Sequence, residues 1–246
     1  MRFTVVNVIH GLPSATKKSP RAERREVMTD ALLDRSMELI EEGGLDALTL
    51  QKVAQSLGYV TTAVYRYFPS KDALVAALQR RSIGVVQAHF ERELARRIAA
   101  ADGASPPTRA LAALLAAADI YLGLPQAEPR AWYLVALLLG DPRPLLSEEE
   151  SRRTLPILAE LLGSVEVLFR DAAREGALEE GPTGERVLGF WAALHGALCL
   201  EKARRIVPAL PTAASIGRAS ARSLLSSWGA TPARLGHAQR ALEKGK

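Results

Sequence analysis

Apolar residues recur at helical spacing along almost the whole chain, and this periodicity restricts the fold more than any other feature. Ala, Leu, Arg and Glu, which favour helices, predominate, whereas runs of β-branched residues are confined to the extreme N-terminus and to short patches. Gly and Pro mark where helices begin or end. The sequence therefore predicts an all-α fold with about nine helices. They are expected over approximately residues 21–42, 49–58, 61–69, 71–100, 107–124, 129–139, 155–175, 183–207 and 212–228.

The composition excludes several classes of protein. Apolar residues make up 48% and charged residues 24% of the 246 residues, which is typical of a globular protein and excludes disorder over most of the length. No apolar run approaches the roughly 20 residues that span a bilayer, and we expect no signal peptide. The single cysteine, Cys199, cannot form an intramolecular disulfide, so we expect a reducing, cytoplasmic location. The net charge of +5 favours anionic partners.

Two domains are predicted, with an arm before them and a tail after them. Residues 1–20 mix Pro, Ser and Lys near their end, which predicts a flexible N-terminal arm. Residues 21–70 hold three helices that must share one small core, and residues 71–230 hold longer, more apolar helices. The helix over residues 71–100 connects the two domains. Residues 231–246 are expected to form a loose C-terminal tail.

A helix, a turn containing Gly58 and a second helix together occupy about 20 residues, which is the spacing of a helix-turn-helix. In such a unit the second helix enters the major groove of DNA, so its first residues must be small or polar and exposed. Thr61, Thr62 and Ala63 meet this requirement. The sequence therefore predicts a DNA-binding domain of three helices.

The remaining residues of this short helix are sorted by their spacing. Val64 and Phe68 are four residues apart, so both are expected to pack inward. Tyr65 and Arg66 then point outward, with Tyr67 beside them. The alternative is that these aromatic side chains are ordinary residues of a small core and its boundary, and for Phe68 we prefer that interpretation.

The stretch LTLQKVAQSLGYVTTAVYRYFPSKDALVAAL, residues 48–78, resembles the DNA-binding domain of the tetracycline-repressor (TetR) family of bacterial regulators. The family's hallmarks are a Thr that caps the second helix, a central Ala, a turn Gly, a Tyr-x-Tyr-Phe ending and a Lys that opens the fourth helix. These places are occupied here by Thr49, Ala54, Gly58, Tyr65, Tyr67, Phe68 and Lys71.

The resemblance implies a role for individual residues. The implied contacts are with phosphate or an outer base at Thr49 and Gln51, with phosphate at Tyr67 and Lys71, and with the major groove at Thr61, Thr62, Ala63 and Tyr65. One position departs from the family: the residue before the recognition helix is often Ser and is Val60 here. The helix cap is then absent or shifts to Thr61, which leaves the register of the base contacts open.

A basic run precedes or opens the first helix, and it comprises Lys17, Lys18, Arg21, Arg24 and Arg25. In some members of the family the corresponding arm reaches phosphates or the minor groove, and electrostatic attraction allows the same contact here. The alternative is a solvated charge run that does not touch DNA.

The helix expected over residues 183–207 has two apolar faces. One face carries the larger side chains of Val187, Trp191, Leu194 and Leu198, and we expect it to pack inside its own domain. The other face is small, and we expect it to meet a second copy of the chain together with part of the next helix. The predicted interface comprises Gly189, Ala193, Gly196, Leu200, Gly217, Ala221 and Leu224. The alternative is that these glycines pack within one chain.

The stretch FWAALHGALCLEKA, residues 190–203, resembles the C-terminal domain of one branch of the TetR family, in which a Trp, a His and a Gly recur on the penultimate helix. His195 is then either a ligand contact or a structural hydrogen-bonding residue. Aromatic residues on separate helices can converge on a cavity or form plain core. The predicted pocket residues are Tyr121, Trp132, Tyr133, Phe169, Trp191 and His195.

These features predict a dimeric, sequence-specific transcriptional regulator, specifically a repressor that a small, mainly apolar effector releases from a pseudo-palindromic DNA operator. The alternatives are an architectural DNA-binding protein and a family member without a working effector pocket. No HExxH, CxxC or GxSxG motif is present, and the four histidines lack the spacing of metal ligands. We therefore expect no enzymatic activity, no cofactor and no metal.

Overall fold

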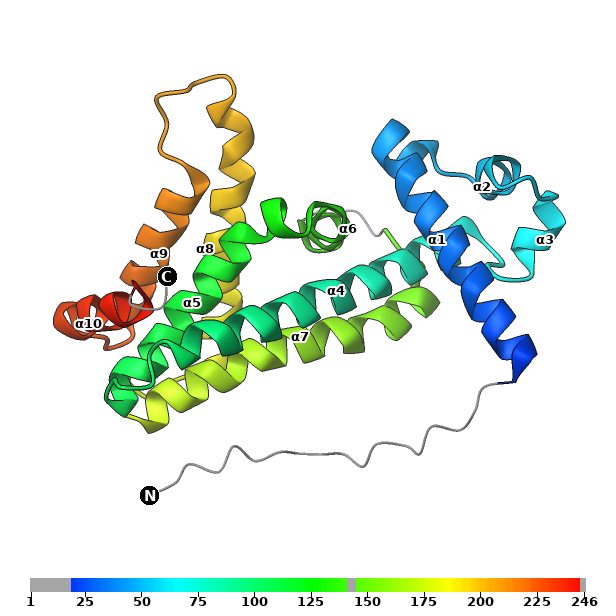
Figure 1. Ribbon diagram of the computed structural model, residues 1–246. Coiled ribbons are helices and arrows are strands. Elements are labelled where there is room, and N and C mark those ends of the chain that lie inside the picture. Colours follow the sequence, from blue (N-terminus) through cyan, green and yellow to red (C-terminus); the bar gives the residue numbers. More distant parts are fainter. Residues whose placement is uncertain (1–18, 141–144, 244–246) are drawn as a thin grey trace. The chain divides into compact units, whose positions relative to one another are not determined.

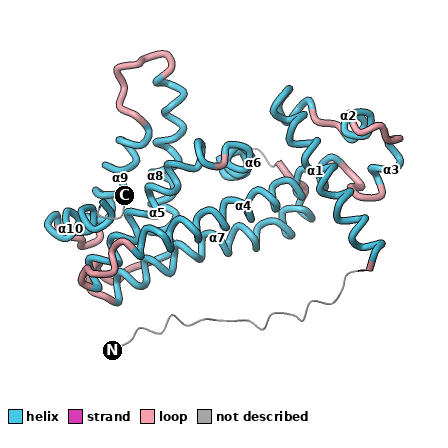
Figure 2. The backbone as a smooth tube through the Cα atoms, in the orientation of Figure 1, coloured by secondary structure: helices cyan, strands magenta, loops and turns pink. Residues whose placement is uncertain are grey.

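The computed structural model describes residues 19–140 and 145–243, which form helices joined by loops and contain no strand (Figures 1 and 2). The prediction of an all-α fold is confirmed for these ranges. The helices are α1 (Pro20–Ala47), α2 (Leu50–Ser56), α3 (Thr61–Tyr65), α4 (Lys71–Ala99), α5 (Pro106–Ala127), α6 (Pro129–Gly140), α7 (Glu148–Arg174), α8 (Thr183–Arg204), α9 (Ala213–Ser227) and α10 (Pro232–Glu243). The chain divides into two units, one ending at Leu74 and one beginning at Val75, so the division falls within α4.

The first unit contains α1, α2, α3 and the first residues of α4. Ser19 caps α1 by accepting a hydrogen bond from the Ala22 N–H at 3.3 Å, and Pro20 opens the helix with a residue that needs no donor. Gly44 breaks the regular helix with a φ of 76°, at the pair of glycines where the sequence predicts the end. The core of this unit is apolar and comprises Leu32, Leu33, Met37, Ile40, Leu48, Leu50, Val53, Ala54, Val64, Phe68 and Leu74.

The second unit is built around α5, most of whose residues are buried. Side chains of α7, α8, α9 and α10 pack with α5 in one apolar core, and α4, α6 and α7 share a second one. Among the described helices, α5 is long and apolar enough to cross a membrane by length and composition, but 61% of its most apolar 18-residue window is buried. Its burial identifies it as a core helix.

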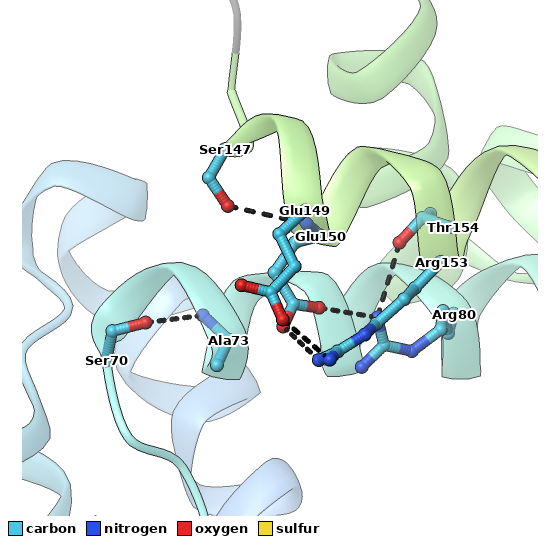
Figure 3. A network of polar contacts seen from close by, with 8 residues as sticks. All are labelled: Ser70, Ala73, Arg80, Ser147, Glu149, Glu150, Arg153 and Thr154. Carbon is cyan, nitrogen blue, oxygen red and sulfur yellow. Dashed lines mark hydrogen bonds and ion pairs between the residues drawn. The ribbon is translucent and has the colours of Figure 1, made fainter.

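A network of ion pairs joins α4 to the beginning of α7 within the second unit (Figure 3). The buried carboxylate of Glu150 accepts hydrogen bonds from Arg80 at 2.9 Å and from Arg153 at 3.0 Å. Arg80 also donates to the Thr154 hydroxyl at 3.4 Å. Each buried polar group of this network therefore has a partner, which burial of charge requires.

The same segment corrects the predicted start of α7, which was placed at Leu155. The helix begins at Glu148, because the Ser147 hydroxyl accepts from the Glu150 N–H at 3.4 Å and three acidic residues follow the cap in the first turn. Ser-x-x-Glu is a capping box, and acidic residues stabilise a helix N-terminus. Pro156, which suggested the later start, lies inside the helix.

The prediction of a loose tail after residue 230 is wrong for the residues that the structure describes. Residues 232–243 form α10, whose N-terminus is capped by the Thr231 hydroxyl. Leu235, Ala238 and Leu242 lie on one side of this helix and are buried in the same core as α5. Three apolar residues at helical spacing after a Thr-Pro start are the signal that predicts this helix. It raises the number of helices in the described residues to ten.

The predicted interface role of Gly217 and Ala221 is also wrong. Gly217 is buried and lies against Leu122 of α5, where a Cβ atom would come within 2.6 Å of a Leu122 methyl group. Ala221 is fully buried in the core of the second unit, and Leu224 is partly buried against that core. The small residues of α9 therefore allow close packing on a helix of the same chain.

We expect Gly217→Ala to lower the free energy of unfolding by about 1–3 kcal/mol, because the new methyl group overlaps Leu122 in a packed core. The matched control is Gly163→Ala in α7, where a Cβ meets nothing within 4 Å. That change should raise the free energy of unfolding by about 0.5–1 kcal/mol through helix propensity. Urea denaturation followed by circular dichroism measures both. A Gly217→Ala protein at least as stable as the parent would contradict the packing of α9 on α5.

Candidate functional site

The turn between α2 and α3 sets the geometry of the first unit's exposed end. Thr49 caps α2, since its hydroxyl accepts from the Lys52 N–H at 3.1 Å. Gly58 adopts a φ of 73°, the left-handed conformation that favours glycine, and the Tyr59 N–H donates back to the Ala54 carbonyl at 2.9 Å. The chain therefore turns within four residues and begins α3 at Thr61, as in a helix-turn-helix.

α3 has an inward and an outward side. Val64 is 1% exposed and Phe68 is buried with it, as their spacing predicts. Tyr65 is 52% exposed, and Thr62 and Arg66 are exposed with it. We call Thr62, Tyr65 and Arg66 the outward side of α3. The other predicted residues of this segment, Thr61, Ala63 and Tyr67, are half-buried.

The N-cap of α3 remains at Val60, so the alternative of a cap at Thr61 is wrong. Val60 has extended backbone angles and makes no side-chain capping bond. Its side chain is 71% exposed. The first residue of α3 is therefore Thr61, and Thr62 and Arg66 lie four residues apart on the same side.

Two of the predicted phosphate-contacting residues make contacts within the first unit. The Lys71 ammonium donates to the Leu45 carbonyl at 3.0 Å and to the Asp46 carbonyl at 3.5 Å, just beyond the break in α1. Tyr67 lies under the guanidinium of Arg25, which is 5.5 Å from the centre of its ring. Both cations remain exposed. These contacts fix the side chains in space and leave their outer surfaces open to an anion.

The remaining predicted residues are placed as follows. Thr49 and Gln51 are exposed at the start of α2. Arg21 and Arg24 are exposed residues of α1 rather than of an arm, because that helix begins at Pro20. Lys17 and Lys18, with the rest of the predicted arm up to residue 18, lie outside the described residues. Sequence reasoning missed Lys52, an exposed cation on α2 whose signal is its place beside Gln51.

Four of the predicted pocket residues meet in the second unit, from α5, α6 and α8. Tyr121 and Trp132 are in edge contact with ring centres 5.3 Å apart. His195 lies 5.8 Å from the Trp132 ring and stacks on Trp191 at 5.1 Å. We call Tyr121, Trp132, Trp191 and His195 the aromatic cluster.

The hydrogen bonds of this cluster determine which of its groups donate and which accept. The indole N–H of Trp191, which can only donate, donates to the Tyr121 oxygen at 2.7 Å. That hydroxyl lies 3.0 Å from Nδ1 of His195, and donation from Tyr121 to Nδ1 leaves no buried hydroxyl proton unpaired. Burial raises the pKa of Tyr121 and lowers the pKa of His195, so both groups are uncharged near pH 7. His195 therefore carries its proton on Nε2.

The aromatic cluster separates two cavities of the second unit. The inner cavity, of about 70 Å³, is apolar and includes Tyr121 and Trp191 in its lining. The outer cavity, of about 1310 Å³, includes Trp132 and His195. Tyr133 also lines the outer cavity but lies outside the cluster. Phe169 does not fit the pocket prediction, since it is fully buried in the core against Phe190 and Trp228 and lines neither cavity.

The two faces of α8 differ in burial. Val187 and Leu194 of the large face are buried in their own unit, and Trp191 and Leu198 are half-buried. On the small face, Gly189, Gly196 and Leu200 are exposed and Ala193 is half-buried. This face is thus uncovered in a single chain. Within the described residues, no group of three or more His, Cys, Asp or Glu side chains is placed to hold a metal ion.

Comparisons with known proteins agree with the geometry of the first unit. Residues 32–78 match the sequence profile described as bacterial regulatory proteins, tetR family. The HTH-type transcriptional regulator BetI of Burkholderia mallei is 35% identical over 94 residues, which cover 38% of this chain and 47% of BetI. The chain therefore spans about half the length of the curated relatives that it matches.

Solved structures extend the likeness to both units. The fatty acid degradation regulator FadR from Bacillus halodurans has a TM-score of 0.59 at 15% identity, covering 87% of this chain and 100% of that one. A TetR family transcriptional regulator from Agrobacterium tumefaciens has a TM-score of 0.57 at 22% identity, covering 83% and 98%. At these identities the likeness shows the fold, which is TetR-like.

We expect Val60→Ser to raise the free energy of unfolding by about 0.5–2 kcal/mol, because a serine hydroxyl can accept from the uncapped N–H groups of α3. Little burial is lost, since Val60 is 71% exposed. Val60→Ala is the control, because it removes the same bulk without adding an acceptor. Urea titrations compare the two variants. Equal stability of Val60→Ser and Val60→Ala would contradict the missing cap.

Proposed function

Because residues 32–78 match the sequence profile of bacterial regulatory proteins of the tetR family, we propose that this chain is a dimeric, sequence-specific transcriptional repressor. The observation that carries the proposal is the outward side of α3, which presents Thr62, Tyr65 and Arg66 to solvent while Val64 anchors the helix. A recognition helix needs this arrangement, because its exposed side chains must reach base edges in the major groove. The protein acts in the cytoplasm, where its DNA lies.

The contacts divide into those that read bases and those that bind phosphate. The outward side of α3 reads bases, with Thr61 and Ala63 close to the groove. Thr49, Gln51, Tyr67 and Lys71 bind phosphate or an outer base, and Lys52 adds a further phosphate contact. The basic residues of α1 and of the preceding arm lie where they can extend this surface.

The second copy of the chain is proposed to bind the small face of α8, through Gly189, Ala193, Gly196 and Leu200. The exposure of this face supports the proposal, because a row of apolar and small residues is usually covered by a partner. Leu224 of α9 is partly buried and is included in this interface, whereas Gly217 and Ala221 are buried within one chain and take no part in it. Two recognition helices about 34 Å apart then read a pseudo-palindromic operator.

The second unit is proposed to bind a small, mainly apolar effector at the aromatic cluster. We assign this unit to the branch of the family whose C-terminal domain carries a Trp, a His and a Gly on one helix, here Trp191, His195 and Gly196 of α8. Residues 21–70 then bind DNA, and the chain from residue 71 onward binds the effector and the second copy. α4 belongs to both units by sequence, so it links the two events. A coupling of about 3 kcal/mol lowers operator affinity roughly 150-fold.

Footprinting with the full chain tests DNA recognition. A regulator protects one short inverted sequence, whereas an architectural protein protects DNA broadly.

Tyr65→Ala should weaken operator binding by about 1–3 kcal/mol and leave binding to random DNA almost unchanged. Lys71→Gln should weaken both and reduce the salt slope by about one. The control is Arg240→Gln, an exposed charge on α10, which should change neither. Equal effects of Tyr65→Ala on both kinds of DNA would contradict base reading.

The dimer has its own test. Gly196→Leu should give monomers in analytical ultracentrifugation and abolish operator binding, because a large side chain prevents close approach of two helices. Gly163→Leu on α7, also a glycine with open space at its Cβ position, should remain dimeric. Dimers of unchanged stability in Gly196→Leu would exclude this face of α8 as the interface.

A further inference from the structure

The outer cavity of the second unit has a charge and a shape that define a class of ligand. We propose that it binds an elongated amphipathic anion, with its acidic group at Lys202, an oxygen acceptor at His195 and an apolar body between them. That the cavity binds such an anion follows from the cavity alone. That this anion is the effector rests on the function proposed above.

The acidic side chains on the cavity wall are already neutralised. Asp119 pairs with Arg218 at 2.7 Å and lies 3.6 Å from Arg97. Glu201 accepts from the Ala213 N–H at 3.0 Å and pairs with Arg204 at 2.8 Å, and both contacts lower its pKa. Within residues 19–140 and 145–243, no acidic group of the wall is left without a cation.

Lys202 is the cation that this pairing leaves over. Its side chain is exposed and lines the cavity, and nowhere in the described chain does it have a hydrogen bond or an ion pair. Arg218, the other strong cation of the wall, is held by Asp119. Among its described lining residues the cavity therefore offers one uncompensated positive charge, which favours an anionic ligand group.

His195 supplies a neutral donor at a second point of the same wall. Its Nδ1 accepts from Tyr121, and its Nε2–H has no hydrogen-bond partner among the described residues, so it can donate to a ligand. Gly140 faces this nitrogen: a Cβ there would lie 2.8 Å from Nε2. Because Gly140 has no side chain, no Cβ atom occupies the space next to this nitrogen.

The spacing of these two groups selects the shape of the ligand. His195 and Lys202 are seven residues apart on α8, so they lie on the same side of the helix about 10 Å apart along its axis. Leu198 lies between them, and Trp132 and Leu137 line the same cavity. An apolar body fits this middle section. The small face with Gly196 and Leu200 points elsewhere around the helix, so a second copy bound there leaves the cavity open.

Two fluorescent probes of nearly equal shape test the charge. Anilinonaphthalene sulfonate carries an acidic group on an apolar body, and N-phenylnaphthylamine is its uncharged counterpart. We expect the full-length protein to bind the sulfonate more tightly. Lys202→Gln should weaken sulfonate binding about 10-fold or more and leave the neutral probe unchanged, because it removes a charge-assisted contact. Lys202→Arg should restore sulfonate binding.

The matched control is Arg205→Gln, which removes the same charge from an exposed residue that does not line the cavity. It should leave both affinities unchanged. The inference is overturned if Lys202→Gln weakens both probes equally or neither, or if Arg205→Gln has the same effect as Lys202→Gln. The titration uses no DNA. If probe binding depends on charge but the protein binds no operator, only the proposed function as a regulator is contradicted. If the protein binds an operator but probe binding does not depend on charge, only this inference is contradicted.

Discussion

The burial of Val64 and Phe68 determines what the first unit can do. α3 has only five residues, too few to be stable alone, so its orientation depends on these two anchors. Because Val64 packs inward, Thr62, Tyr65 and Arg66 must face outward. The turn at Gly58 makes that packing possible, because it changes the direction of the chain directly after α2. A core contact thus selects the residues available to a partner.

In the second unit, polar groups organise an otherwise apolar interior. The hydrogen bonds from Trp191 to Tyr121 and on to His195 satisfy three polar groups on two helices, so burying them costs little. They also fix the rotamers and the tautomer of the cluster, which apolar packing alone would leave less defined. The wall between the two cavities is therefore held by hydrogen bonds as well as by packing, and different residues line each side of it.

Local signals predicted most of the fold and part of the site. The helix-turn-helix could be located because its cap, its turn glycine and its apolar anchors lie within 23 residues of one another, from Thr49 to Lys71. Long-range packing could not be predicted in the same way. Gly217 and Gly196 look alike in sequence, yet Gly217 meets Leu122 of α5, almost one hundred residues away, and Gly196 meets solvent. The prediction that Phe169 lines the pocket was wrong for the same reason, because periodicity does not tell which of two neighbouring cores a helix face enters.

The ion-pair network around Glu150 has a mechanical consequence. Its carboxylate is shared by Arg80 of α4 and Arg153 of α7. Removing one of these partners would destabilise the fold, because it leaves part of a buried negative charge uncompensated. Sliding α4 along α7 by even one turn would separate Arg80 from both Glu150 and Thr154. These contacts thus favour a single register of the two helices, and only a molecule that binds a shifted register more strongly than this one can change it.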